Sequence, residues 1–388
     1  MKAYRVETCA AALLALLAGG CQTVTSTYDS LFGARPAQKP AELVAIRSVV
    51  SPKILWHGSV GGADKNAFFP AVAGNVVYAT GAAGQITGFD AANGRQATRI
   101  DAGQRLSGGV GAGDRLVVVG THNGEVLAFD RDGKPLWKAQ LTGEVLAPPR
   151  VADGVVVVRA GDGRVFGLNA ADGKRKWLYQ RATPALSVRT HAGVVIQRGA
   201  VFAGFPGGRL VAIELANGKV IWESVVALPR GTTELERVAD ITSPPAVDDH
   251  QACAVAFQGR VACFDALRGT SIWARDLSSS AGMGADIRNF YVTDDKNAVA
   301  ALDKTNGASI WKQDKLFGRG VSGPLAFGRY VVVGDFEGYV HFLSREDGSF
   351  AARIATDGSP IITPAVALDL TSFVVQTRNG GIFAITVQ

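Results

Sequence analysis

Few residues in this chain of 388 have the types and spacing that acid–base, nucleophilic or metal chemistry requires. The five histidines stand far apart and lack the spacing of metal ligands, at positions 57, 122, 191, 250 and 341. The sequence contains no Cys-x-x-Cys-His haem attachment and no glycine-rich phosphate loop. We therefore expect no enzymatic activity and no metal or other cofactor.

Two cysteines flank a turn at Gln258-Gly259. Cys253 and Cys263 are nearly symmetric about this turn, so they would face each other across one hairpin. In an oxidising compartment they would form a cross-strand disulfide. For a loop of about ten residues the chain-entropy stabilisation is roughly 2–3 kcal/mol. The alternative is two buried free thiols. In either state the two cysteines would affect the stability of the protein and would take no part in redox catalysis.

The N-terminus has the pattern of an export signal. Lys2 and Arg5 supply positive charge, and residues 10–17 form an apolar run too short to span a bilayer. The segment Leu17-Ala18-Gly19-Gly20-Cys21 resembles the lipobox of bacterial lipoproteins, which implies removal of residues 1–20 and diacylation of Cys21. An ordinary cleaved signal with an incidental cysteine is the alternative.

The residues after Cys21 predict a flexible tether. Residues 21–52 carry scattered Thr, Ser and Pro that interrupt any regular period. No later segment is long and apolar enough for a membrane helix, so membrane contact is expected through the lipid anchor alone. Gln22 stands where an Asp commonly signals inner-membrane retention, so we expect an outer-membrane lipoprotein that faces the periplasm.

A repeat of about forty residues fills the rest of the chain. Each copy has a β-branched run, a glycine turn, an apolar strand, a second glycine turn and, in the clearest copies, a tryptophan; GEVLAFDRDGKPLW at 124–137 is an example. The glycines or asparagine that open the eight copies are at 84, 124, 163, 208, 259, 297, 338 and 381. The repeat predicts an all-β, eight-bladed β-propeller of four-stranded antiparallel blades over residues 53–388.

The tryptophans indicate how the ring closes. All six occupy one repeat position, at 56, 137, 177, 222, 273 and 311. The last copy ends at Gln388 before its own tryptophan strand, so the strand around Trp56 is expected to complete the last blade and remove the open sheet edges. Their repetition predicts packing between blades.

Composition and charge limit the classes of partner. The chain has 47% hydrophobic residues and a formal charge of only +6. We find no basic stripe or recognition motif, so nucleic acid is not an expected partner.

The Ala-x-Asp-x-x-x-Gly-x-x-x-Trp pattern resembles the quinoprotein-type propeller repeat. That superfamily contains quinone-dependent alcohol dehydrogenases and a non-enzymatic branch, the BamB family of outer-membrane assembly lipoproteins. The lipobox-like cysteine and two segments between repeats, 184–189 (PALSVR) and 231–245 (GTTELERVADITSPP), resemble the BamB branch. The resemblance implies a scaffold that binds the periplasmic domains of BamA, with docking of unfolded outer-membrane proteins as a further role.

Carried over by position, the resemblance implies four partner-binding residues, Leu186, Val188, Arg189 and Asp240. Thr242 stands where the family pattern has a second acidic residue. An aliphatic pair beside an arginine is a typical small hot spot. Taken without the resemblance, Arg189 and Asp240 would be a solvated loop ion pair worth less than about 1 kcal/mol.

Two other functions remain open on the sequence. A quinone-dependent dehydrogenase shares the tryptophan repeat, but its adjacent cysteines are missing here and the repeats leave no room for a substrate funnel. An envelope lipoprotein that binds polysaccharide or another partner through the same ring is the second, because the repeat period does not encode the partner of a loop.

Overall fold

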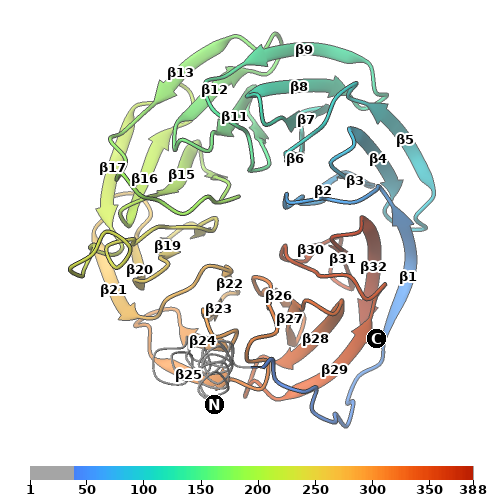
Figure 1. Cartoon of the computed structure of the whole chain (residues 1–388), viewed down its shortest axis with the longest axis vertical. Coiled ribbons are helices and arrows are strands. Elements are labelled where there is room, and N and C mark those ends of the chain that lie inside the picture. Colours follow the sequence, from blue (N-terminus) through green and yellow to red (C-terminus); the bar gives the residue numbers. More distant parts are fainter. Residues whose placement is uncertain (1–38, 388) are drawn as a thin grey trace, which may run out of the picture. The chain divides into compact units, whose positions relative to one another are not determined.

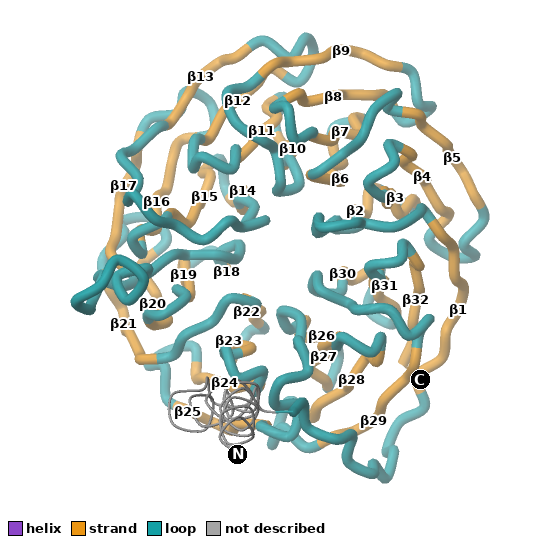
Figure 2. The backbone as a smooth tube through the Cα atoms, viewed as in Figure 1, coloured by secondary structure: helices purple, strands orange, loops and turns teal. Residues whose placement is uncertain are grey.

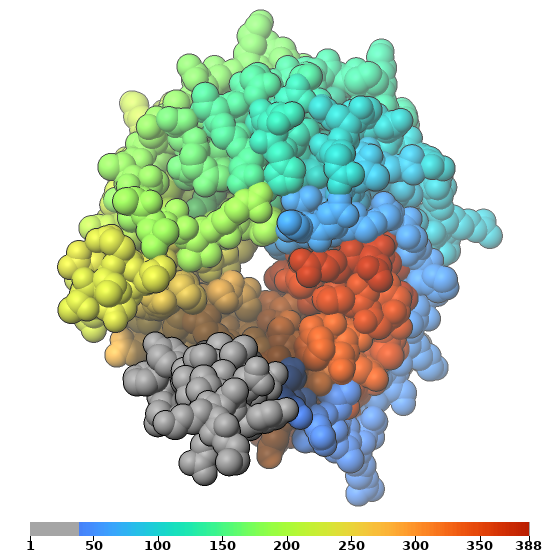
Figure 3. Space-filling model, viewed as in Figure 1, coloured from blue at the N-terminus to red at the C-terminus, as the bar shows by residue number. Residues whose placement is uncertain are grey.

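The computed structural model describes residues 39–387, and within them residues from Ala41 onward form one compact unit. This unit is a ring of four-stranded antiparallel sheets (Figure 1), and the space-filling view shows an opening at its centre (Figure 3). The predicted signal peptide, residues 1–20, and the predicted lipidation site, Cys21, lie outside the described residues. No helix within the described residues is long and apolar enough to cross a membrane.

The eight sheets are the eight predicted blades. Blade 1 contains β2 Ala71–Ala73, β3 Val76–Thr80, β4 Gln85–Asp90 and β5 Gln96–Asp101, and blade 2 contains β6 Gly108–Gly113, β7 Leu116–Gly120, β8 Glu125–Asp130 and β9 Pro135–Gln140. Blade 3 contains β10 Arg150–Ala152, β11 Val155–Arg159, β12 Val165–Asn169 and β13 Arg175–Tyr179, and blade 4 contains β14 Val195–Gln197, β15 Ala200–Phe205, β16 Arg209–Glu214 and β17 Val220–Val225. Blade 5 contains β18 Ala246–Val247, β19 Gln251–Val255, β20 Arg260–Asp265 and β21 Ser271–Asp276, and blade 6 contains β22 Gly282–Ala285, β23 Asn289–Thr293, β24 Val299–Asp303 and β25 Ser309–Gln313. Blade 7 contains β26 Leu325–Phe327, β27 Tyr330–Gly334, β28 Tyr339–Ser344 and β29 Phe350–Ala355. Blade 8 contains β30 Val366–Ala367, β31 Ser372–Gln376 and β32 Gly381–Val387, and its outer strand is β1 Pro52–Ser59.

The closing strand is the predicted one. β1 pairs antiparallel with β32, from Pro52 opposite Val387 to Ser59 opposite Gly381, so the two ends of the ring meet in blade 8 (Figure 1). Pairing this strand removes an edge that would otherwise be open to another chain.

The core lies between the blades. Buried apolar residues form clusters that each join two neighbouring blades, such as the cluster of Phe202 and Leu210 with Ala252 and Phe264 between blades 4 and 5. A cluster around Trp56 and Val374 joins blade 8 to Val77 of blade 1, so the ring is also closed by its core. Burial of apolar area between sheets is therefore what holds the propeller together.

Each tryptophan connects its blade to the next one. The indole Nε1 donates to a backbone carbonyl in the next blade at 2.8–3.0 Å, as Trp56 does to Ala91 and Trp222 to Ala266. Gly94 of blade 1 has a φ of +71°, and a Cβ there would lie 2.6 Å from the Trp56 ring, so this turn admits only glycine. The predicted packing role of the tryptophans is the one observed.

The compact unit begins earlier than the predicted boundary at residue 53. Residues 41–50, which we call the strap, lie alongside blade 7 in space. Arg319 Nη1 donates to the Ala41 carbonyl at 3.0 Å, and the Val49 amide donates to the Ala351 carbonyl at 2.9 Å. The strap is thus bonded to the ring, although it falls within the predicted tether of residues 21–52.

Candidate functional site

The alternation of strand direction gives the ring two distinct faces. The connector face carries the loops from the outer strand of one blade to the inner strand of the next, together with the turns between the second and third strands of each blade. The turn face carries the turns between first and second strands and between third and fourth strands. The two segments singled out from the sequence, 184–189 and 231–245, are both connectors and so lie on the connector face. The second connector begins in the loop that projects at the outer rim of the ring beside β21 (Figure 2; yellow in Figure 3).

Asp240 fixes these two connectors to each other. Its side chain is 2% exposed and accepts hydrogen bonds from the backbone amides of Val188 at 2.7 Å and Gly207 at 3.0 Å. The Thr190 hydroxyl adds a bond to the Thr242 carbonyl at 2.6 Å. Asp240 therefore holds the backbone of the 184–189 loop, and it does not pair with Arg189, which bonds to Glu144.

A buried arginine lies below the same loops. Arg159 is 5% exposed, and its Nη1 donates to the Ala192 carbonyl at 2.9 Å. Burial lowers the pKa of Arg159 to about 10, although the negative charge of Asp240 opposes this shift. The described contacts include no ion pair between the two side chains, so Asp240 acts on Arg159 through its charge alone, while its hydrogen bonds hold the loop backbone.

The partner of Arg189 is Glu144. Arg189 Nε and Nη2 donate to the two Glu144 carboxylate oxygens at 2.8 and 2.7 Å, and His122 Nδ1 lies 3.2 Å from Oε2. The hydrogen bond from Arg189 is the main reason that the pKa of Glu144 lies below its usual value, and it likewise raises the pKa of Arg189. This two-point contact fixes the plane of an exposed guanidinium.

The remaining predicted residues differ in exposure. Leu186 is 40% exposed, Val188 is half-buried and Arg189 is exposed, so these three form the accessible part of the loop. Thr242 is buried, and its hydroxyl lies 3.4 Å from the Ser280 carbonyl. The structure thus brings all four predicted residues together and adds Glu144, which no sequence signal indicated because it lies one connector and 45 residues away from Arg189.

The two cysteines lie inside blade 5, away from these loops. Cys253 of β19 and Cys263 of β20 are opposite each other in the ladder, both are fully buried, and their sulfurs are bonded in the structure. The described residues hold no group of three or more His, Cys, Asp or Glu side chains arranged for a metal ion.

The described chain is therefore an eight-bladed propeller in which six tryptophans bond to the next blade, and connector loops on one face are held in place by buried and paired charged groups. Among solved structures it is similar to BamB from Moraxella catarrhalis, with a TM-score of 0.79 and 26% identity, over 87% of this chain and 100% of that one. It is also similar to quinohemoprotein alcohol dehydrogenase from Comamonas testosteroni, with a TM-score of 0.70 over 86% of this chain and 76% of that one. At 12% identity, the second likeness concerns the fold alone.

Sequence comparison identifies the family within this class. The family profile described as outer membrane protein assembly factor BamB matches residues 82–313 and 298–388. The outer membrane protein assembly factor BamB of Nitrosomonas eutropha is 45% identical over 391 residues, which cover 99% of this chain and 95% of that protein. The BamB protein of Bordetella pertussis is 41% identical, over 98% of this chain and 96% of that protein. The chain belongs to the BamB family of outer membrane protein assembly factors, as the resemblance of its repeat predicted.

Proposed function

We propose that this chain is a non-enzymatic scaffold lipoprotein at the outer membrane, facing the periplasm, which binds the periplasmic domains of BamA within the BAM complex. Membership of the BamB family supports a role in assembling outer-membrane proteins. In this role the propeller holds BamA in an arrangement suited to folding and inserting β-barrel proteins, and it carries out no reaction itself.

One observation carries the choice of site, namely that an exposed leucine and a fixed arginine share one preorganised loop. Asp240 holds the loop backbone, and Glu144 holds the Arg189 guanidinium, so little conformational freedom remains to be lost when a partner binds. Leu186 supplies apolar area and Arg189 supplies directional donors, which is a common composition for an interface hot spot.

The test is the affinity between the mature protein and BamA periplasmic domains from the same organism, measured by calorimetry. Leu186→Ala/Arg189→Ala should abolish binding while leaving the fold intact, because both side chains are exposed. The matched control is Leu370→Ala/Arg288→Ala, an exposed leucine and arginine in turns of the opposite face. The control should bind like wild type.

The outcomes separate the function from the site. Binding that survives the Leu186/Arg189 change would keep the scaffold role and place its site elsewhere on the ring. No binding by the wild-type protein would remove the proposed function and leave the propeller unaffected.

A further inference from the structure

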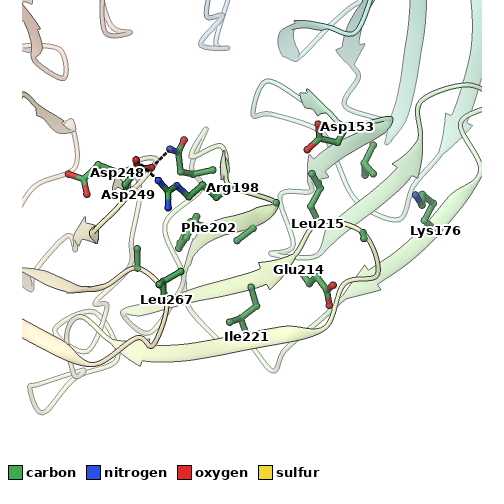
Figure 4. Close-up of a pocket in the computed structure, with 16 residues that line it drawn as sticks. Asp153, Lys176, Arg198, Phe202, Glu214, Leu215, Ile221, Asp248, Asp249 and Leu267 are labelled. Atoms are coloured by element: carbon green, nitrogen blue, oxygen red, sulfur yellow. Dashed lines mark hydrogen bonds and ion pairs between the residues drawn. The ribbon is translucent and has the colours of Figure 1, made fainter.

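The turn face has a cavity of about 560 Å³ that spans blades 3, 4 and 5. Its lining comes from the turns at Asp153, at Gln197–Gly199 and at Asp248–Asp249, and from the neighbouring turns after β16 and β20 (Figure 4). These turns join first to second strands and third to fourth strands, so the cavity lies on the face opposite to Leu186 and Arg189.

The floor and rim of this cavity are apolar. Phe202 and Leu215 are buried at its base, while Ile221 is 49% exposed and Leu267 is 70% exposed. A single exposed aliphatic residue on a surface needs no explanation, but several around one concave site indicate a place where an apolar group binds.

Two of the four carboxylates that line the cavity have no cationic partner among the described residues. Asp249 is paired with Arg198 at 2.7 Å, and Asp248 is paired with Lys304 of the adjacent blade. Within the described part of the chain Asp153 has no side-chain hydrogen bond or ion pair, and Glu214 accepts only the side-chain amide of Asn217, at 2.7 Å. Lys176 is the one lining cation that no described carboxylate pairs with, so the free groups are net negative.

We propose that this cavity is a second docking site, which takes a segment of a partner protein carrying an apolar side chain next to arginine or lysine. The apolar side chain would rest against Phe202, Leu215 and Ile221, and the cation would lie near Asp153 and Glu214. Figure 4 shows the lining residues spread from Asp249 to Lys176 across three blades, a shape that suits an extended segment better than a compact small molecule.

Two sites on opposite faces would let one ring hold two partners at once. A segment in the cavity would not meet the 184–189 loop, because the blades separate them. The inference does not depend on BamA binding, so the failure of either proposal would leave the other standing.

The test uses the full-length protein in detergent and two fluorescein-labelled peptides, GRFRIG and its charge-reversed counterpart GEFEIG. Fluorescence anisotropy should show that the basic peptide binds at least about tenfold more tightly than the acidic one. Equal affinity for the two peptides, or no binding of either at millimolar concentration, would overturn the proposal.

Variants locate the binding. Asp153→Asn/Glu214→Gln removes both free carboxylates, and Asn tolerates the φ of +49° at position 153. Ile221→Thr removes apolar area from an exposed strand position that suits threonine. Each of these two variants should lower the affinity for the basic peptide about tenfold.

The matched control for Ile221→Thr is Ile310→Thr. Ile310 also precedes a tryptophan on an outer strand and is 45% exposed, but it does not line the cavity. Its variant should bind the peptide like wild type. An equal loss in this control, or unchanged binding in both cavity variants, would show that the peptide binds elsewhere and would contradict the proposal.

Discussion

Asp240 Oδ2 accepts a hydrogen bond from the Val188 amide at 2.7 Å, although 52 residues separate the two positions in the chain. The same carboxylate accepts from Gly207, and its charge opposes the burial effect on Arg159. Two connectors and a blade strand therefore depend on one buried group. This arrangement explains how a loop with exposed side chains keeps a defined backbone.

Replacing this group should destabilise the ring and also impair binding. In Asp240→Asn the amide nitrogen meets a buried backbone donor that then lacks an acceptor, so we expect a loss of about 1–3 kcal/mol in the free energy of unfolding. Urea denaturation followed by tryptophan fluorescence measures it. The control Asp64→Asn, at an exposed ion pair, should change stability by less than about 1 kcal/mol. A fully stable Asp240→Asn that has lost BamA would instead make Asp240 a contact residue.

Arg189 and Glu144 should act as one unit in binding BamA. Arg189→Lys keeps the charge but not the two-point geometry, and Glu144→Gln weakens the hold on the guanidinium, so each should lower affinity several-fold. The double variant should be little weaker than either single one, because both remove the same positioning. Calorimetric titration of the four proteins measures this coupling. Strictly additive losses would mean that the two side chains contribute separately.

The disulfide in blade 5 should contribute stability without affecting binding. For a loop of about ten residues, loss of the bond in Cys253→Ala/Cys263→Ala should cost roughly 2–3 kcal/mol of unfolding free energy. Denaturation of wild type with and without reductant should reproduce the difference, and mass spectrometry of unreduced peptides identifies the bond. BamA affinity should be unchanged. Free thiols in protein isolated from the periplasm would contradict the prediction.

The buried charges of blade 7 should make the ring less stable in mild acid. His341 is fully buried; Arg353 Nε donates to its Nδ1 at 3.2 Å, so its Nε2 donates to Asp335, at 2.9 Å. Burial lowers the pKa of His341, and the bond to Asp335 only partly opposes this. The unfolded imidazole takes up a proton near the ordinary histidine pKa of 6.5, whereas the folded one resists, so stability falls as pH drops below that value.

Asp335 also makes the folded protein less stable as the pH falls, but at lower pH than His341 does. Burial alone would raise the pKa of Asp335, but the bonds from His341 and Arg319 outweigh it and hold the pKa below 3.8. Its contribution is therefore present above that value and is lost only in stronger acid. Urea midpoints at about pH 7.5 and about pH 5 should differ in wild type and differ less in His341→Gln. His191, whose pKa is also lowered by burial, accounts for part of what remains.

The fold was predictable because its signal is repeated. Eight copies of one turn-and-strand pattern identify the blades, and the incomplete last copy identifies β1 as the closing strand; the structure confirms both. Degenerate copies are less informative. In blade 1 the ladder places Thr98 at the tryptophan position, and its hydroxyl donates to the Arg131 carbonyl of the next blade at 3.1 Å.

The candidate site was predictable only as a set of positions. The repeat spacing places Leu186 and Arg189 between two blades and the family resemblance singles them out, but neither shows that Glu144 meets Arg189 from another connector. Neither shows that Asp240 points inward. The strap escaped detection for the same reason: its residues have the composition of a linker, and the arginines that bond to Ala41 and Val44 lie 278 and 309 positions further along the chain.

The pairing of Pro52 with Val387 also sets an order of events. A chain is synthesised from its N-terminus, so β1 emerges first and its partner β32 emerges last. Blade 8 and the contact of Trp56 with blade 1 would then form only after the whole chain has been delivered. Contacts of such long range are slow to form. Until then the growing ring keeps an exposed edge at each end, which makes this interval the period when the protein depends most on protection from aggregation.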